Sequence, residues 1–238
     1  MGDLKDKVAI VTGASSGIGA GIVKELLESG MNVVGLARRK AKIEELGKDY
    51  EGKLFAIETD ITKTEDIIKA FKWTEEHVGP VYVLVNNAGI AHVSQFEEID
   101  VEKIEEVFNT NLLALTICTK EAIRSMKANN IDGFIININS AAGHEISRYP
   151  GLSIYCTSKH GVTAFTETIR WELAKSESKI RITSLSPGLV ESEMSVRLLD
   201  KHPYMTSEDI GKAIKYIITQ PAIVNITELT IRPTGETL

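Results

Sequence analysis

The sequence predicts a doubly wound α/β fold, in which helices cover both faces of one parallel sheet of about seven strands. Three observations predict it. Short β-branched runs alternate with longer segments of helical periodicity, the runs are continuously apolar, and the prolines fall between elements. Continuous apolar strands separated by helices are typical of a parallel sheet that is buried on both faces and has right-handed crossovers.

The expected strands are the apolar runs. In chain order they cover Val8–Val11, Asn32–Leu36, Leu54–Ile57, Tyr82–Val85, Phe134–Ile138, Ile180–Leu185 and Leu229–Ile231. Helical periodicity is clearest over Gly19–Ser29, Val101–Met126 and Ser153–Ala174. No repeat or linker-like tract interrupts this series, so we expect residues 1–238 to form a single domain.

The composition excludes several classes of function. The 238 residues carry a net charge of −6 with both signs interspersed, without the basic stripe that nucleic acid attracts. No apolar run has the ~18 residues of a membrane span, and the start of the chain lacks a signal-peptide pattern. Cys118 and Cys156 form no CxxC motif or Cys/His cluster. We therefore expect a reduced, cytoplasmic protein without a metal site.

A glycine-rich turn, Thr12–Gly19, follows the first strand and opens a helix. Glycines let a pyrophosphate come close, and the first helix turn offers free N–H groups and the positive end of its dipole. An ordinary strand-to-helix turn has a similar composition, so the motif alone is a weak signal. Its position favours a dinucleotide site, with these expected contacts: Gly13, Ser15, Ser16, Gly17 and Ile18.

The second strand ends without the acid that an NAD site usually places there for the ribose hydroxyls. Arg38, Arg39 and Lys40 follow instead. Guanidinium groups suit a 2′-phosphate in charge and in geometry. The alternative is a solvated helix start, but basic residues at a helix N-terminus are unfavourable unless an anion compensates. The sequence therefore predicts NADP(H), held by Arg38 and Arg39.

Polar or small residues also follow the next three strands. Asp60 and Ile61 close the third, where the Asp60 carboxylate would either accept from an adenine amino group or cap the next helix. Asn87 and Gly89, within the NNAG motif after the fourth strand, would leave room for a ribose or form an asparagine turn. Ser140 ends the fifth strand, where a serine is more often a cap than a catalyst.

Tyr155 and Lys159 lie four residues apart, on one face of the helix expected from Ser153. An unperturbed phenol has a pKa of about 10. A nearby ammonium lowers this pKa, so that the phenol can exchange a proton near neutral pH. A Tyr/Lys pair at this spacing is usually a surface pair, so the spacing alone leaves both interpretations open.

In this order, TGxxxGIG, NNAG, Asn111, Ser140 and the YxxxK of Tyr155 and Lys159 resemble the short-chain dehydrogenase/reductase family across essentially the whole chain. The resemblance implies a Rossmann domain in which Tyr155 donates or accepts a proton and Ser140 orients a substrate carbonyl. It also implies that Lys159 binds the nicotinamide ribose and lowers the pKa of Tyr155. Asn111 would hold a water that links Lys159 to solvent.

The family's Pro-Gly loop corresponds here to Pro187–Val190, which the resemblance assigns to the nicotinamide carboxamide. Ser192 stands where a threonine is usual and keeps the hydroxyl. The expected cofactor contacts in this region are therefore Pro187, Gly188, Val190 and Ser192. The substrate lid would follow, over about 189–207.

A narrower resemblance links the chain to NADP-dependent members that include insect farnesol dehydrogenases and a vertebrate 3-keto and 17β-hydroxysteroid reductase. It is carried by Leu36–Arg38, Ala114–Thr119, Ile135–Ser140 and Leu229–Pro233. It implies a lipophilic carbonyl or alcohol substrate of the farnesol, retinoid or steroid type. Apolar lid residues favour this substrate class, although they would serve equally as core contacts of a lid helix.

The resemblance also implies a homodimer or a homotetramer. The apolar faces of the Val101–Met126 and Ser153–Ala174 helices would then pack against a second subunit, or else wholly on the protein's own sheet.

Two other functions share the expected fold. A 3-oxoacyl carrier-protein reductase has the same catalytic residues, but we expect basic residues at its entrance, where Arg148 is the main one in this chain. The second is a catalytically silent protein that senses NADP or acts as a scaffold. The complete set of catalytic residues argues against a silent protein.

Overall fold

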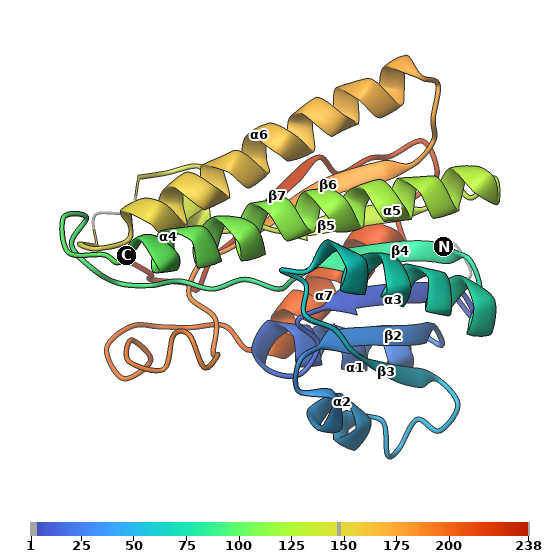
Figure 1. Cartoon of the computed structure of the whole chain (residues 1–238), viewed down its shortest axis with the longest axis horizontal. Coiled ribbons are helices and arrows are strands. Elements are labelled where there is room, and N and C mark those ends of the chain that lie inside the picture. The colour runs from blue at the N-terminus through green and yellow to red at the C-terminus, as the bar shows by residue number, and fades with distance from the viewer. Residues whose placement is uncertain (1–3, 147–148, 238) are drawn as a thin grey trace.

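The computed structural model describes residues 4–146 and 149–237 and confirms the doubly wound parallel sheet (Figure 1). Its seven parallel strands lie in the order β3-β2-β1-β4-β5-β6-β7. They are β1 (Val8–Thr12), β2 (Asn32–Ala37), β3 (Leu54–Glu58), β4 (Val81–Asn86), β5 (Phe134–Ile138), β6 (Arg181–Pro187) and β7 (Glu228–Ile231). Each strand expected from the sequence is present.

The strand order reverses between β1 and β4. From β1 the chain moves outward to β2 and β3, then returns to place β4 on the other side of β1. In open sheets of this kind, ligands bind at the carboxyl ends of the strands beside such a reversal. The central strands β1 and β5 are buried along their whole length, which is why their sequences are continuously apolar.

Helices cover both faces of the sheet (Figure 1). One face carries α1 (Gly17–Glu28), α2 (Lys40–Leu46) and α7 (Ser207–Ile218), whose buried side chains share one core cluster. The other face carries α3 (Thr64–His77), α5 (Ala114–Ala128) and α6 (Ser153–Lys175), which share a second cluster. Helices α1 and α7 meet closely, because a Cβ at Gly21 would lie 2.6 Å from the Ser207 carbonyl oxygen.

The segment expected as one helix over Val101–Met126 is divided. It forms α4 (Val101–Phe108), a π-helical turn η1 (Asn109–Leu113) and α5. A π turn inserts an extra residue into a helix and is frequent at functional sites. Here the inserted turn carries Asn111, and it aims this side chain inward, where it is 1% exposed.

Residues 189–206, which we call the lid segment after the role expected for them, follow β6 and contain no helix. The base of this segment is closed by a bridge between Val190 and Met205, in which Glu191 N donates to Met205 O at 2.9 Å and Met205 N donates to Leu189 O at 3.0 Å. Turns fill the residues between, up to α7. The alternative in which the apolar residues form core contacts of a lid helix is therefore wrong.

The lid's apolar residues divide between core and solvent. Leu189 and Val190 are buried, whereas Met194 and Val196 are exposed.

In the part of the chain that the structure describes, no helix has the length and apolarity to cross a bilayer.

Candidate active site

The glycine-rich turn after β1 packs against the end of β4. Gly13 and Gly17 have φ values of 66° and 51°, a left-handed conformation that favours glycine. A Cβ at Gly13 would lie 2.9 Å from Ala88 Cα, and a Cβ at Gly19 would lie 2.2 Å from Gly13 O. The turn therefore accepts only glycine at these points, and it presents backbone instead of side chains to a ligand.

Asn87 ties β4 to this turn. Its Nδ2 donates to Thr12 O at 2.9 Å, while Thr12 Oγ1 accepts from the backbone N–H groups of Asn87 and Ala88, both at 3.0 Å. The alternative that Asn87 only forms an asparagine turn is therefore wrong, because its amide binds the backbone of the glycine-rich turn. We did not predict the role of Thr12, although it lies within the TGxxxGIG motif.

The start of α1 fits a pyrophosphate. The helix begins at Gly17, and its N-cap residue, Ser16, makes no capping hydrogen bond through its side chain. The first-turn N–H groups of a helix have no intrahelical partner and attract anions. Ser15 and Ile18 border the same turn and are partly exposed. The chain thus has a cradle that fits a dinucleotide.

Arg38 and Arg39 differ in their surroundings. Arg39 donates to both carboxylate oxygens of Glu193 at 3.0 and 3.1 Å, and to Ser16 Oγ at 2.7 Å. Lys42 lies 3.4 Å from the same carboxylate, which belongs to the lid. Arg38 is exposed, and no hydrogen bond or ion pair holds it within residues 4–146 and 149–237. Arg38 is thus the available guanidinium, whereas Arg39 joins the lid to the glycine-rich turn.

The Asp60 carboxylate forms a local turn. Its Oδ1 accepts from Thr62 N at 3.1 Å and from Thr62 Oγ1 at 2.7 Å. The Thr62 hydroxyl is the main reason that the pKa of Asp60 lies below its usual value, and the charge of Arg38 contributes. The N-cap of α3 is Lys63, so a helix cap at Asp60 is wrong. Ile61 is partly buried and packs against the core on the α3 side.

The end of β5 and the start of α6 bring Ser140, Tyr155 and Lys159 together. Ser140 opens a short 3₁₀ turn, η2 (Ala141–Gly143), and its Oγ accepts from Ala142 N at 3.1 Å. Lys159 Nζ donates to Ile138 O at 2.8 Å and lies 5.8 Å from the centroid of the Tyr155 ring. A phenol, a hydroxyl and an ammonium therefore lie at one strand end.

Burial dominates the ionisation of this group. Burial lowers the pKa of Lys159 to about 8. It raises the pKa of Tyr155, and a hydrogen bond from Ser140 acts in the opposite direction. The expectation that Lys159 lowers the pKa of Tyr155 stays a prediction, because burial is the largest of the effects on this phenol.

Asn111 is held from two sides. Its Nδ2 donates to Ile90 O at 2.9 Å and to Ser158 Oγ at 3.0 Å, while its Oδ1 accepts from Ile90 N at 2.8 Å. A Cβ at Gly89 would lie 3.5 Å from Asn111 Oδ1 and 3.8 Å from Lys159 Nζ. Asn111 and Lys159 thus both face Gly89. Because glycine has no side chain, the space next to both groups stays open.

The Pro-Gly loop is supported by the C-terminal segment. Gly188 N donates to Ile231 O at 2.8 Å, and Leu189 N donates to Glu236 Oε1 at 2.6 Å. A Cβ at Gly188 would lie 2.5 Å from the Glu236 carboxylate. Glu236 has no motif around it, and we did not predict its contribution.

The start of the lid also contacts the cofactor turn. A Cβ at Gly17 would lie 3.2 Å from the Cβ of Ser192. The Ser192 hydroxyl lies 3.0 Å from that of Ser195, so this corner is internally bonded. Pro187 and Val190 are buried, which leaves their backbone as the part that a ligand would meet.

The order and spacing of these features decide the family. The model for short chain dehydrogenases matches residues 7–203, from the first residue before β1 into the lid. This chain belongs to the short-chain dehydrogenase/reductase family.

Known proteins of this family are similar over nearly their full lengths. A farnesol dehydrogenase from Aedes aegypti is 45% identical over 237 residues, which cover 97% of this chain and 97% of the relative. The human dehydrogenase/reductase SDR family member 11 is 38% identical over 249 residues, covering 98% and 96%. The closed form of a serine dehydrogenase complexed with NADP+ has a TM-score of 0.89 at 27% identity, covering 97% and 96%.

Two further expectations concern the surroundings of this dehydrogenase site. Arg148, the basic residue expected at the entrance, lies outside the described residues. Within the described part of the chain, no three His, Cys, Asp or Glu side chains gather into a group that would hold a metal ion.

Proposed function

We propose that this short-chain dehydrogenase is an NADP(H)-dependent oxidoreductase that interconverts a lipophilic carbonyl compound and its alcohol. One observation carries the proposal: Ser140, Tyr155 and Lys159 converge where β5 ends, at the same edge of the sheet as the glycine-rich turn. When bound there, the nicotinamide supplies or accepts the hydride. The expected substrates are of the farnesol, retinoid or steroid type.

The protein groups move the proton and hold the substrate. In the direction of reduction, the Tyr155 phenol donates its proton to the substrate oxygen, and it withdraws a proton in the direction of oxidation. The Ser140 hydroxyl donates to the same oxygen and fixes its position. Lys159 holds the nicotinamide ribose, and Asn111 holds a water between Lys159 and solvent.

NADP(H) is supported by the charges after β2. No acid follows this strand, and the exposed Arg38 guanidinium is available to a 2′-phosphate. The remaining expected contacts lie around the same edge: the glycine-rich turn, Asp60 and Ile61, Asn87 and Gly89, and the start of the lid. The serine dehydrogenase that resembles this chain was solved as an NADP+ complex.

A lipophilic substrate is supported by apolar side chains on the loops after β4, β5 and β6. These exposed side chains are Val93, Phe96, Ile146, Tyr149, Met194, Val196 and Tyr204. Loops at the carboxyl ends of a doubly wound sheet surround its ligand. The farnesol dehydrogenase at 45% identity is named for a substrate of this class.

We further propose that the enzyme is a cytoplasmic homodimer or homotetramer. Leu113 on η1 and Trp171 on α6 are 50% and 63% exposed. A second subunit would remove these large apolar side chains from water.

Replacement of Tyr155 by phenylalanine tests the mechanism. We expect turnover to fall by roughly 10²–10⁴-fold, the usual contribution of a general acid or base. NADPH affinity, measured by the quenching of protein fluorescence, should change little. A variant that retains full turnover would contradict the role of Tyr155.

An NADPH-linked activity screen tests the substrate class. The panel contains farnesal, retinal, ketosteroids, diketones and acetoacetyl thioesters, and we expect the highest kcat/KM with the lipophilic carbonyls. Preference for the thioesters would instead indicate a 3-oxoacyl reductase. NADPH binding without consumption across the panel would indicate a sensor or a scaffold.

A further inference from the structure

Asn137 on β5 and Asn139, the residue after its end, bind two threonines on α6. Asn137 Nδ2 donates to Thr166 Oγ1, and Asn139 Nδ2 donates to Thr163 Oγ1, both at 2.8 Å. Alternate residues of a strand face the same side, and residues three apart on a helix share a face. The two bonds are therefore links of the same chemistry, one from β5 and one from the residue that follows the strand by one position, to the same helix.

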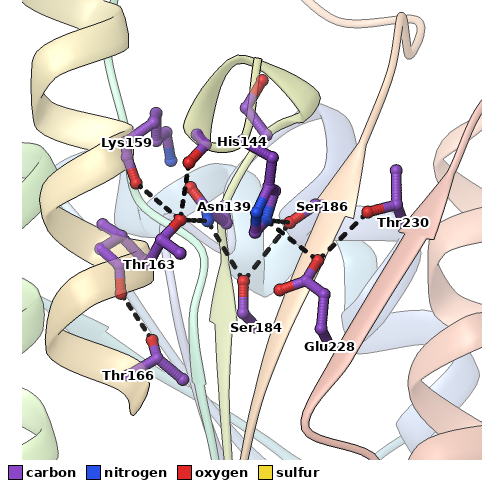
Figure 2. A network of polar contacts seen from close by, with 12 residues as sticks. Asn139, His144, Lys159, Thr163, Thr166, Ser184, Ser186, Glu228 and Thr230 are labelled. Carbon is purple, nitrogen blue, oxygen red and sulfur yellow. Dashed lines mark hydrogen bonds and ion pairs between the residues drawn. The ribbon is translucent and has the colours of Figure 1, made fainter. Parts of the chain in front are cut away.

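Only the Thr163 link reaches the catalytic loop. Thr163 Oγ1 donates to Gly143 O at 2.8 Å, the last residue of η2, while it accepts from Asn139, the residue directly before Ser140. Figure 2 shows the Thr163 hydroxyl next to the side-chain amide of Asn139, which it accepts from. One hydroxyl thus fastens both ends of the loop that carries Ser140.

The helix that supplies this hydroxyl also carries the acid–base pair. Thr163 lies one turn after Lys159, whose carbonyl oxygen is 3.3 Å from Thr163 Oγ1. Tyr155 lies one turn before Lys159 on the same helix. The Thr163 hydroxyl therefore connects the Ser140 loop rigidly to the part of α6 that holds the phenol.

The surroundings leave the loop little freedom to compensate. Asn139 is 3% exposed, and its Nδ2 also donates to Ser184 Oγ at 3.1 Å. A Cβ at Gly143 would lie 2.5 Å from Asn139 Oδ1, so the end of η2 rests directly on this amide. The loss of the Thr163 hydroxyl would leave Gly143 O without this donor and one N–H of Asn139 Nδ2 without this acceptor, both in a buried space.

We propose that Thr163 is a positioning residue, which sets the Ser140 hydroxyl against the Tyr155 phenol by clamping both ends of the Asn139–Gly143 loop. The proposal rests on the acid–base role of Tyr155 in the proposed function. The Thr166 link serves the attachment of α6 to β5 and connects instead, through Asn137, to Asn86 at 2.9 Å.

The test compares Thr163→Val with Thr166→Val, a matched control with the same substitution on the same helix face. In the NADP+-linked oxidation of farnesol, we expect Thr163→Val to lower kcat by roughly 10–100-fold, because small misplacements of catalytic groups have effects of this size. The Kd for NADPH should stay within about twofold in both variants. Thr163→Ser restores the hydroxyl and should restore kcat.

A second readout does not depend on the substrate. The ultraviolet difference absorbance of tyrosinate, taken relative to Tyr155→Phe, follows the ionisation of this phenol across pH. Because the Ser140 hydrogen bond lowers the pKa of Tyr155, a displaced Ser140 should move the titration to higher pH in Thr163→Val. Thr166→Val should titrate like the wild type. Thr163→Ala, which only removes atoms, replaces Thr163→Val if that variant does not fold.

Equal losses of kcat in Thr163→Val and Thr166→Val would show a merely structural role and overturn the proposal. An unchanged tyrosinate titration in Thr163→Val would overturn it as well. Full turnover by Tyr155→Phe is a separate result: it would remove the proposed function, while the titration would still decide whether Thr163 positions Ser140.

Discussion

At the scale of single residues, burial shifts the pKa values of Lys159 and Tyr155 away from those of the free side chains. Lys159 is 5% exposed, and burial brings its pKa to about 8. An ammonium that titrates in this range is a proton carrier within reach of neutral pH. Desolvation of the phenol has the opposite consequence for Tyr155, since it favours the neutral, proton-donating form.

The lowered pKa of Lys159 predicts a pH dependence of stability. Below about pH 8 the folded protein holds a buried ammonium, at a cost. As the pH rises from about 8 toward the unfolded pKa near 10.4, the unfolded chain binds more protons than the folded one, so the stability rises. Relative to Lys159→Met, the wild type should gain up to roughly 3 kcal/mol across this window. Urea denaturation at several pH values measures the difference, and a constant difference would contradict the prediction.

Arg38 should decide the choice of cofactor. In Arg38→Asp, charge reversal beside the 2′-phosphate should weaken NADPH binding by roughly 10–100-fold, while NADH binding should hold or improve. Lys40→Asp is the matched control, because Lys40 is exposed nearby and pairs with Glu44. Titrations with both cofactors measure the ratio. Equal NADPH losses in the two variants would indicate a general effect of charge.

At the scale of elements, what can be predicted depends on how local the cause is. The strands follow from runs of buried residues, and the glycine-rich turn follows from its own spacing. The Asn139–Thr163 and Leu189–Glu236 bonds join residues 24 and 47 positions apart, so no local pattern announces them. The π turn at Asn111 is invisible for a related reason, since its extra residue leaves the helical pattern nearly unchanged.

The lid segment contributes the contact between Glu193 and Arg39, which would compete with a 2′-phosphate of the proposed cofactor for the guanidinium. In Glu193→Gln, the freed Arg39 should strengthen NADPH binding by about 1.5–5-fold at low salt, because exposed ion pairs are worth 0.2–1 kcal/mol. NADH binding should not change. Glu191→Gln removes the same charge from an exposed lid residue that forms no ion pair in the described chain. An equal gain in this control would contradict the competition.

At the scale of the whole molecule, each of the two helical layers exposes a large aromatic side chain. Trp171 lies on α6, on the opposite face of the sheet from Tyr216 on α7, and these side chains are 63% and 55% exposed. In Trp171→Arg, a charge placed in the proposed subunit contact should reduce the particle to a smaller species in sedimentation velocity. Tyr216→Arg should leave a dimer intact and should split a tetramer only if α7 forms its second contact. A wild-type monomer would contradict the oligomer.

The domain as a whole was the most predictable feature. Its strand order follows from the alternation of strands and helices together with right-handed crossovers, and the proposed catalytic residues lie at the strand ends where that order predicts a ligand site. The substrate was the least predictable. The chain supplies the lid with turns instead of a regular element, so neither periodicity nor capping signals describe its shape.

The bridge between Val190 and Met205 has a consequence for how such an enzyme acquires new substrates. Because these two residues meet, the segment between them begins and ends at nearly the same place, and its length can change at a small entropic cost. Insertions, deletions or grafts within residues 196–204 would therefore leave Tyr155 in place, whereas Ser192 and Glu193, which contact Gly17 and Arg39, have to be kept. Specificity can diverge in this one replaceable segment while the chemistry of the fold is inherited intact.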